Sequence, residues 1–275
     1  MPKRLHRNLC SGRFLKRALS PILFLSIFAA PAAHPQNLRV AAASDLQFAL
    51  ADLAAQYEKQ SGVKLEISFG SSGNFFAQIQ NGAPFDLFFS ADVSYPDKLV
   101  TAHFADPDSL QVYAVGRLVL WLPPDSLLDA AAGIKVLLDP RIQKIAIANP
   151  EHAPYGRAAV LALQHAGLYD QLKPKLVLGE NISQAAQFVQ SGGAQAGLIA
   201  FSLASSPAMK SGRRWEIPPD YYPRVEQSVV VLSASPNKSA SQKFLAFLRS
   251  PSARATFDRY GFLLSPPPAE EKHKL

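Results

Sequence analysis

The chain has 275 residues, 48% of them hydrophobic, with 28 Lys and Arg against 21 Asp and Glu. Six of the basic residues and none of the acidic ones lie among the first 35, so the remainder carries 22 basic and 21 acidic side chains and a net charge of about +1. Without a basic stripe interleaved with aromatic residues, this remainder gives no indication of a nucleic-acid partner. The only cysteine, Cys10, also lies among the first 35 residues, which excludes disulfides and thiolate metal sites from the rest of the chain.

Residues 1–35 have the pattern of a secretory signal peptide. Six basic residues precede the apolar run Ala18–Ala30, and Ala30-Pro31-Ala32 is typical of a cleavage site. The apolar run is shorter than the roughly 20 residues that a membrane-spanning helix needs, although an uncleaved anchor is the alternative. Cys10 precedes the run and cannot be the lipid-bearing cysteine of a lipoprotein. We expect a secreted mature protein.

The first half of the mature chain is predicted to alternate strands and helices. Apolar periodicity predicts strands at 38–42, 63–69 and 85–90, a helix over 46–61, and a second helix that begins at Phe75 and stops at Asn81-Gly82. Such a β-α-β-α-β run forms a parallel sheet with ligands at the carboxyl ends of its strands.

The second half continues the alternation and then returns. The predicted strands are 112–122, 144–148, 175–178, 196–201 and 227–233, and the predicted helices are 157–166, 182–190, 240–249 and one ending at Tyr260-Gly261. The strands 112–122 and 227–233 are candidates for hinge segments that join two α/β lobes. A cleft between lobes is a frequent place for a small ligand. Residues 265–275 are Pro-rich and then charged, which predicts a disordered tail.

Four short turns each precede the start of a predicted helix. They are Ala43-Ser44-Asp45, Gly70-Ser71-Ser72-Gly73-Asn74, Pro154-Tyr155-Gly156 and Glu180-Asn181-Ile182-Ser183. Each would present free backbone N–H groups, and in three cases hydroxyls, at the positive end of a helix dipole. If the four turns converge, they form an anion pocket that contains no formal positive charge.

Five segments carry a family resemblance, and they occur in order over residues 38–264. They read AAASDLQFALADLAAQYEKQSG, FGSSGNFFAQIQNGAPFDLFFSAD, NPEHAPYGRAA, GENISQAAQFVQSGGAQAGLIAFS and FDRYGF. In these segments the chain resembles the periplasmic molybdate-binding proteins of ATP-binding-cassette importers. The resemblance implies an α/β fold of the two-lobed periplasmic binding protein type (type II), each lobe a mainly parallel sheet flanked by helices, with the ligand in the interlobe cleft.

The same resemblance implies the boundaries and partners of the protein. Residues 36–116 and 225–264 are expected in lobe 1 and residues 117–224 in lobe 2. The expected ligand is one molybdate or tungstate ion, and the expected partner is an inner-membrane permease of the ATP-binding-cassette type. The protein is expected to be a periplasmic monomer without a cofactor and without enzymatic activity.

Binding residues follow from the resemblance motif by motif. Ser44 and Ser72 are expected to donate from hydroxyl and amide groups, and Tyr155 and Ile182 from their backbone amides. The family often has a tyrosine where this chain has Ala200, and the hydroxyl of Tyr155 is a candidate replacement. None of these residues is expected to bond directly to the metal atom, because all of them would contact the oxygens of the anion.

Asp45 departs from the family pattern beside the first serine. A carboxylate about 4 Å from a dianion would be repelled by several kcal/mol at intermediate dielectric, so only the Asp45 amide is expected to face the ligand. One interpretation makes the side chain a cap for its own helix. The other makes it a proton acceptor for a hydrogen-bearing oxyanion such as hydrogenphosphate, which leaves sulfate and phosphate as alternative ligands.

Simpler or rival interpretations remain for the other residues. Ser44 and Ser72 could be ordinary N-caps, and Tyr155 a surface or hinge aromatic. A secreted hydrolase that uses Ser72 and His152 is a weaker alternative, because the turn at Ser72 lacks the G-x-S-x-G pattern of a nucleophile elbow. His103, His152 and His165 lack metal-ligand spacing. A sensor that signals to a membrane receptor would use the same fold and site.

Overall fold

The computed structural model of the protein describes residues 37–264, in which strands and helices alternate. The predicted signal peptide and the predicted tail lie outside the described residues. Within the described range the chain belongs to one compact unit, and no helix there is long and apolar enough to cross a membrane.

Ten strands are found in the described range. They are β1 (Leu38–Ala43), β2 (Leu65–Gly70), β3 (Leu87–Ser90), β4 (Gln111–Gly116), β5 (Leu118–Leu122), β6 (Ile145–Ala148), β7 (Leu176–Gly179), β8 (Ala196–Ala200), β9 (Arg213–Glu216) and β10 (Val225–Val231).

Helices separate most of these strands. The α-helices are α1 (Gln47–Ser61), α2 (Ser72–Gln80), α3 (Ser94–Thr101), α4 (Pro154–His165), α5 (Tyr169–Leu172), α6 (Ile182–Gln190), α7 (Phe201–Ala204), α8 (Lys238–Leu248) and α9 (Pro251–Arg259). Short 3-10 turns are η1 (Ser44–Leu46), η2 (Pro107–Ser109), η3 (Ala130–Leu138) and η4 (Lys173–Lys175).

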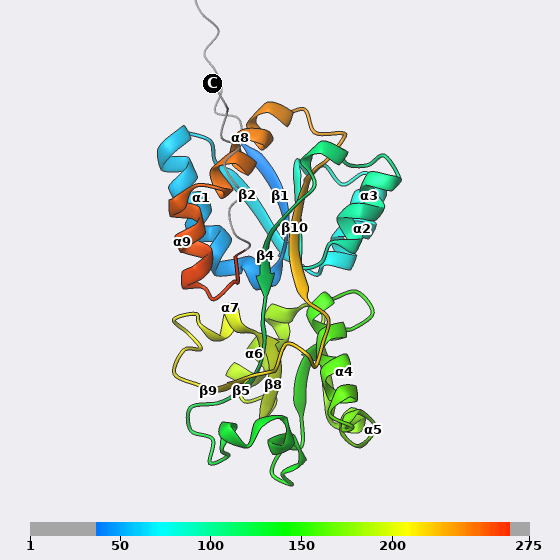
Figure 1. The fold of residues 1–275 in the computed structure, drawn as a ribbon, viewed down its shortest axis with the longest axis vertical. Helices are drawn as coiled ribbons and strands as arrows, with labels where there is room; N and C mark the ends of the chain where they lie inside the picture. The colour runs from blue at the N-terminus through cyan, green and yellow to red at the C-terminus, as the bar shows by residue number, and fades with distance from the viewer. Residues whose placement is uncertain (1–36, 265–275) are drawn as a thin grey trace, which may run out of the picture. The chain divides into compact units, whose positions relative to one another are not determined.

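The strands form two five-stranded sheets within the described residues, with the orders β2-β1-β3-β10-β4 and β7-β6-β8-β5-β9. We call the first sheet with its helices lobe 1 and the second lobe 2 (Figure 1). The first three strands of each order pair in parallel, whereas the last two add antiparallel pairings. Each sheet is mixed, but only β10 in lobe 1 and β5 in lobe 2 run against the other four strands, so the predicted mainly parallel sheets are confirmed.

Helices cover both faces of the lobe 1 sheet because its central strands are apolar on both faces. Val40 and Ala42 of β1 pack in the cluster that includes α1, α8 and α9. Ala41, between them, packs in the separate cluster that includes α2 and α3. In Figure 1 these two groups of helices lie on opposite sides of the sheet. The alternation of side chains along a strand explains the two layers.

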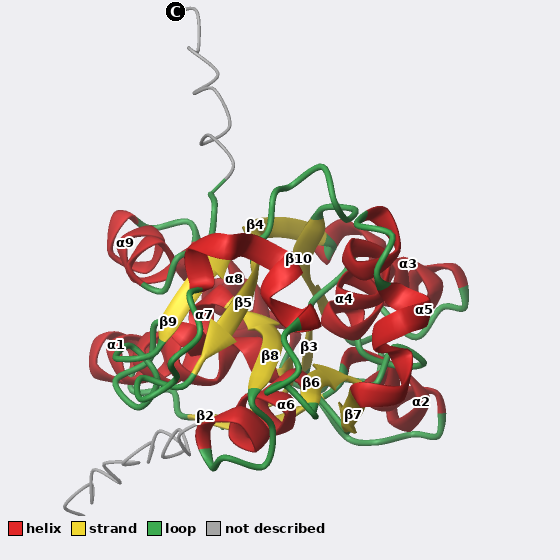
Figure 2. Cartoon of the chain, turned by 90° about the horizontal axis from the view of Figure 1, so that it is seen from below, coloured by secondary structure: helices red, strands yellow, loops and turns green. Residues whose placement is uncertain are grey.

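In lobe 2 the helices lie close to the sheet because small side chains stand between them. Strand β6 is buried throughout, and the helices α4 and α6 meet the sheet through buried alanines. A Cβ added to Gly197 of β8 would lie 2.5 Å from Cγ2 of Val189 on α6, so only glycine fits this approach. Figure 2 shows the strands of both lobes in the interior with helices around them.

The chain crosses between the lobes at Arg117. One continuous strand was predicted over 112–122, but β4 ends at Gly116 in lobe 1 and β5 begins at Leu118 in lobe 2. Arg117 is held where the strand breaks, since its Nε donates to the carbonyl of Gly261 at 2.8 Å and its guanidinium lies 3.7 Å from the ring centre of Phe201. The apolar run is interrupted there only by Gly116 and Arg117, and the prediction of one continuous strand passed over this interruption.

Two helices begin earlier than predicted, and two short elements were not predicted. Helix α2 begins at Ser72 instead of Phe75, because Ser71 caps it by accepting the N–H of Asn74 at 3.3 Å. Helix α4 begins at Pro154, a residue suited to the first helical position. Helix α3 and the edge strand β9 were not predicted, since both are short and polar.

Candidate functional site

A small cavity of about 190 Å³, its open side included, lies where the two lobes meet. The five residues predicted to bind the ligand all line it. The lining residues are Ala43, Ser44, Asp45, Gly70, Ser71, Ser72, Ala91, Ala153, Pro154, Tyr155 and Ile182. They come from the carboxyl ends of β1, β2 and β3 in lobe 1 and from the starts of α4 and α6 in lobe 2. The structure therefore brings together the four turns that the sequence singled out.

Three helices begin at this cavity. Within the described residues, the backbone N–H groups of Ser72 in α2, Tyr155 in α4 and Ile182 in α6 have no hydrogen-bond acceptor. Each helix has at least nine residues, so each directs the positive end of a developed dipole at the cavity. These unpaired donors can bind an anion.

Ser72 presents a free donor, whereas its neighbour Ser71 is the cap. The Ser72 side chain is fully buried and accepts the N–H of Ala91 at 3.0 Å, so its own hydroxyl proton remains available. Ser71 caps α2 and also lies 3.0 Å from Nδ1 of His152 in lobe 2. The interpretation of Ser72 as an ordinary N-cap is therefore wrong.

Ser44 connects the lobes and is likewise no ordinary N-cap of its own helix. Its hydroxyl donates to Oδ1 of Asn181 at 3.1 Å and accepts the N–H of Ser183 at 3.2 Å. Both partners lie at the start of α6 in lobe 2. In this arrangement the hydroxyl proton of Ser44 is engaged, so donation to a ligand requires that Asn181 release it.

Asp45 is not a helix cap. Its side chain is 1% exposed, and neither carboxyl oxygen has a hydrogen-bond partner among the described residues. The turn η1 has no side-chain cap. Burial raises the pKa of Asp45 to about 7, although the nearby hydroxyl of Tyr155 and, to a smaller extent, the amide of Gln227 favour the charged form.

The Tyr155 hydroxyl is turned into the interior near the lobe crossing. Its side chain is 1% exposed, and a Cβ added to Gly116 would lie 2.0 Å from its oxygen. Burial, with a contribution from the charge of Asp45, holds the pKa of Tyr155 well above its usual value. The hydroxyl has no hydrogen-bond partner among the described residues. Ala200, where the family often has a tyrosine, is buried and does not line the cavity.

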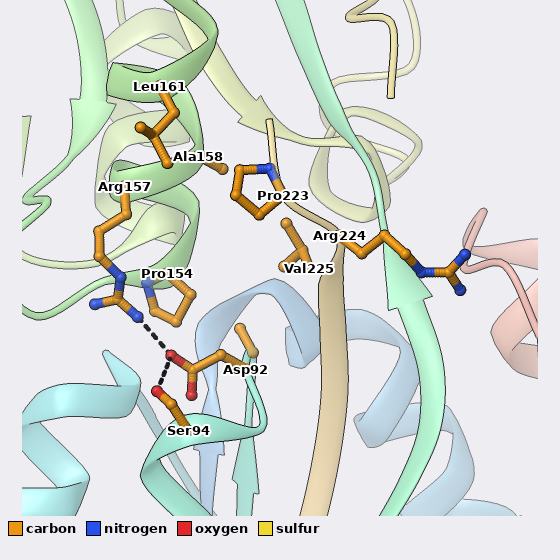
Figure 3. A pocket seen from close by; sticks show the side chains of 10 residues that line it. Asp92, Ser94, Pro154, Arg157, Ala158, Leu161, Pro223, Arg224 and Val225 are labelled. Atoms are coloured by element: carbon orange, nitrogen blue, oxygen red, sulfur yellow. Dashed lines mark hydrogen bonds and ion pairs between the residues drawn. The ribbon is translucent and has the colours of Figure 1, made fainter. Parts of the chain in front are cut away.

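The cavity has no positively charged side chain, since no Lys or Arg lines it. The neighbouring Arg157 lines a second pocket, which shares Ala91 and Pro154 with the first. Figure 3 shows Arg157 reaching from α4 to the carboxylate of Asp92, which also accepts from Ser94 at 3.1 Å. The charge of Arg157 is thus neutralised by an ion pair between the lobes.

Sequence reasoning missed the polar residues that close the rim of the cavity. Asn74 donates to Glu180, and the N–H of Gly73 donates to the carbonyl of His152 at 2.9 Å. Both bonds join lobe 1 to lobe 2. These residues occur in the quoted motifs, but the motif order alone gave no sign that they pair across the cleft.

The structure gives little support to the alternative of a serine hydrolase. His152 contacts Ser71 and not the predicted Ser72, and its Nε2 lies 3.7 Å from a carboxylate oxygen of Glu180. Ser71 oxygen is occupied as the cap of α2, and its side chain is 3% exposed. No group of three or more potential metal ligands occurs among the described residues.

The sequence as a whole matches a known family. The profile of the family described as bacterial extracellular solute-binding protein matches residues 38–263. The chain belongs to this family. The predicted resemblance to periplasmic solute-binding proteins is thereby confirmed.

Individual members of this solute-binding family are similar over nearly their whole length. The molybdate-binding protein ModA of Azotobacter vinelandii is 38% identical over 232 residues, which cover 84% of this chain and 91% of that protein. ModA of Rhodobacter capsulatus is 35% identical over 249 residues, or 90% and 96% of the two chains. The solved structure of the A. vinelandii periplasmic protein superposes with a TM-score of 0.79 over 83% of this chain and 100% of that one. The predicted α/β binding-protein fold is thereby confirmed.

Proposed function

We propose that the protein captures molybdate, or its analogue tungstate, outside the cytoplasm and delivers it to a membrane permease of the ATP-binding-cassette type. The names of its relatives support the ligand, since proteins 38% and 35% identical to it are molybdate-binding proteins. The family supports the class, an extracellular solute-binding protein.

The observation that carries this proposal is the convergence of neutral donors on one cavity. Ser72 supplies an amide and a hydroxyl from lobe 1, and the amides of Tyr155 and Ile182 come from lobe 2. Rigid turns fix the positions of such donors, so selectivity follows the size of the anion, while helix dipoles stabilise its charge. A lysine, in contrast, would attract any anion.

Because donors come from both lobes, ligand binding stabilises the closed arrangement. We propose lobe boundaries at 36–116 and 225–264 for lobe 1 and 117–224 for lobe 2. The change of sheet at Arg117 and the start of β10 at Val225 support these boundaries. We further propose that the protein acts as a periplasmic monomer after cleavage of residues 1–35, without a cofactor or catalysis.

Isothermal titration calorimetry of the leader-free protein tests the ligand. We expect one molybdate or one tungstate per protein, with similar affinities because the two anions are nearly equal in size. Sulfate is smaller and should bind weakly, and phosphate carries a proton that the neutral donors do not accept. Tight binding of sulfate or phosphate in preference to molybdate would contradict the assigned ligand.

Asp45 favours a second candidate ligand. A carboxylate beside the cavity could accept the proton of hydrogenphosphate, which molybdate lacks at neutral pH. The absence of another hydrogen bond to either Asp45 oxygen within the described residues leaves it free for that role. Phosphate binding that Asp45→Asn abolishes, while molybdate does not bind, would support this candidate.

A further inference from the structure

Asp45 belongs to a buried polar cluster behind the cavity, at the crossing between the lobes. Its two carboxyl oxygens, the hydroxyl of Tyr155 and Nε2 of Gln227 are all buried and lack hydrogen-bond partners among the described residues. A Cβ added to Gly116 would lie 2.0 Å from the Tyr155 oxygen and 2.9 Å from Gln227 Nε2. The cluster thus joins the anion cavity to the ends of β4 and β10, where the chain passes between lobes.

The groups packed around Asp45 provide no compensating positive charge. Tyr155 of α4 and Tyr113 of β4 both experience the charge of Asp45, and Tyr222 interacts electrostatically with Tyr155. Of the elements that pack on η1, α6 and α7 have no ionisable side chain over Ile182–Gln190 and Phe201–Ala204. The other two, α1 and β2, carry Asp52, Tyr57, Glu58, Lys59 and Glu66, none of which influences the Asp45 carboxyl. Among the described residues no lysine or arginine influences the Asp45 carboxyl.

Lobe 2 also holds the backbone of this residue. Ser202 of α7 donates to the backbone carbonyl of Asp45 at 2.7 Å. The side chain is 1% exposed, so its carboxyl lies out of water while the lobes remain together. A charged, unpaired carboxylate in this place would face both the cost of burial and the charge of a bound dianion.

We propose that Asp45 is a neutral carboxylic acid in the anion-loaded protein, so that capture of a dianion takes up one proton at this side chain. The inference rests on the proposed function, because it concerns the same cavity. Asp45 would then act as a hydrogen-bond donor where its carboxylate would repel the ligand. This role also distinguishes it from a proton acceptor for hydrogenphosphate.

The neutral acid has hydrogen-bond partners within the cluster and removes a buried charge that no cation balances. Its hydroxyl can donate to the ligand or to the Tyr155 oxygen, while its carbonyl oxygen can accept from Nε2 of Gln227. The hydroxyl of Tyr155 and the amide of Gln227 favour the charged form, but the cost of burial outweighs them. A bound dianion adds a repulsion that only the carboxylate experiences.

The pH dependence of the anion affinity follows from how binding changes the pKa of Asp45. Burial raises the pKa of Asp45 to about 7, and the negative charge of a bound anion raises it further. Below about pH 7 the acid is protonated before binding, and affinity is independent of pH. Above it each captured anion takes up a proton, so affinity falls by up to about tenfold per pH unit.

Calorimetry in two buffers with different ionisation enthalpies counts these protons directly. At about pH 8, titration of the wild-type protein with molybdate should show uptake approaching one proton per anion, and close to none at about pH 6. Molybdate itself stays deprotonated across this range. Binding without proton uptake at pH 8 would overturn this inference and leave the proposed function intact.

Two variants test whether the proton is taken up by the side chain of Asp45. Asp45→Asn keeps the shape of the acid without its charge, so it should take up no proton and should bind molybdate more tightly than the wild type at pH 8. Asp92→Asn, a control that removes a carboxylate from the neighbouring ion pair, should retain the uptake. Uptake that persists in Asp45→Asn would show that another group binds the proton.

The inference stays testable if Asp45→Asn fails to fold, since the wild-type proton count needs no variant. Tyr155→Phe gives an additional test. The Tyr155 hydroxyl lowers the pKa of Asp45, so its removal should leave more of the free protein protonated and reduce the uptake at pH 8. An increased uptake would contradict the assigned contact. If the wild type binds no oxyanion at either pH, both the proposed function and this inference fail.

Discussion

The two lobes build their halves of the cavity from different chemistry. Lobe 1 contributes mostly side-chain groups, the hydroxyls of Ser44 and Ser72 and the carboxyl of Asp45, beside the one backbone amide of Ser72. Lobe 2 contributes the backbone amides of Tyr155 and Ile182 at the starts of two helices. Side-chain donors change with one substitution, whereas backbone donors depend only on the chain path. Specificity should therefore be sensitive to mutation in lobe 1 and robust in lobe 2.

The largest loss of affinity is expected from the lobe 1 hydroxyls together. Ser44→Ala with Ser72→Ala should weaken molybdate binding by roughly 2 to 6 kcal/mol, because each donor to a charged group contributes about 1 to 3. Titration calorimetry measures the change, with circular dichroism as the control for folding. An unaltered affinity in the double variant would remove these serines from the site.

Asp45 should make lobe 1 less stable as the pH rises. Its folded pKa of about 7 exceeds the unfolded value of 3.8, so the contribution to stability is complete below about pH 4 and is lost as pH rises through about 7. Above that range Asp45→Asn should be more stable than the wild type by roughly 3 to 5 kcal/mol. Urea unfolding at pH 4.5 and 8 measures both; equal differences at the two pH values would contradict the buried titration.

A single backbone donor of lobe 2 can be removed without disturbing the helix. Ile182 is the first residue of α6 and follows Asn181 in an extended conformation, so proline is tolerated there. Ile182→Pro deletes the N–H and should weaken binding by about 1.5 to 3 kcal/mol. Ile182→Val, which keeps the amide, is the matched control and should bind nearly as the wild type. Equal losses in both variants would point to packing instead of donation.

The smallest effect is expected at the rim. Asn74→Ala removes the bond to Glu180, whose side chain is 59% exposed, and should cost at most about 1 kcal/mol of binding. Calorimetry at low and high salt would measure it. A loss as large as that of Ile182→Pro would mean that the rim contacts, and not the amides, control closure.

Much of lobe 1 and of the site was predictable because the signals are local. Apolar patterns identified the strands β1, β2 and β3, and the turns before α2, α4 and α6 indicated the converging amides. The prediction of the ligand, and the binding roles of Tyr155 and Ile182, came from the family resemblance and not from periodicity. Neither source could distinguish Ser71 from Ser72 as the cap, since both serines suit that position.

The rest depends on contacts between distant parts of the chain. The bond from Ser44 to Asn181 joins residues 137 positions apart, and no local pattern encodes it. The change of sheet at Arg117 is set by Gly261 and Phe201, which come much later in the sequence. A helix cap was one of the two interpretations of Asp45, since aspartate is frequent at that position. Its unpaired burial arises from contacts with residues far along the chain, among them Tyr155 and Ser202.

Anomalous diffraction from crystals grown with tungstate would show where the anion binds, because tungsten marks its position. One strong peak is expected in the cavity, with oxygen atoms within hydrogen-bond distance of the amides of Ser72, Tyr155 and Ile182. A peak beside Arg157 and Asp92, or an anion contacted by only one lobe, would contradict the site proposed for this protein.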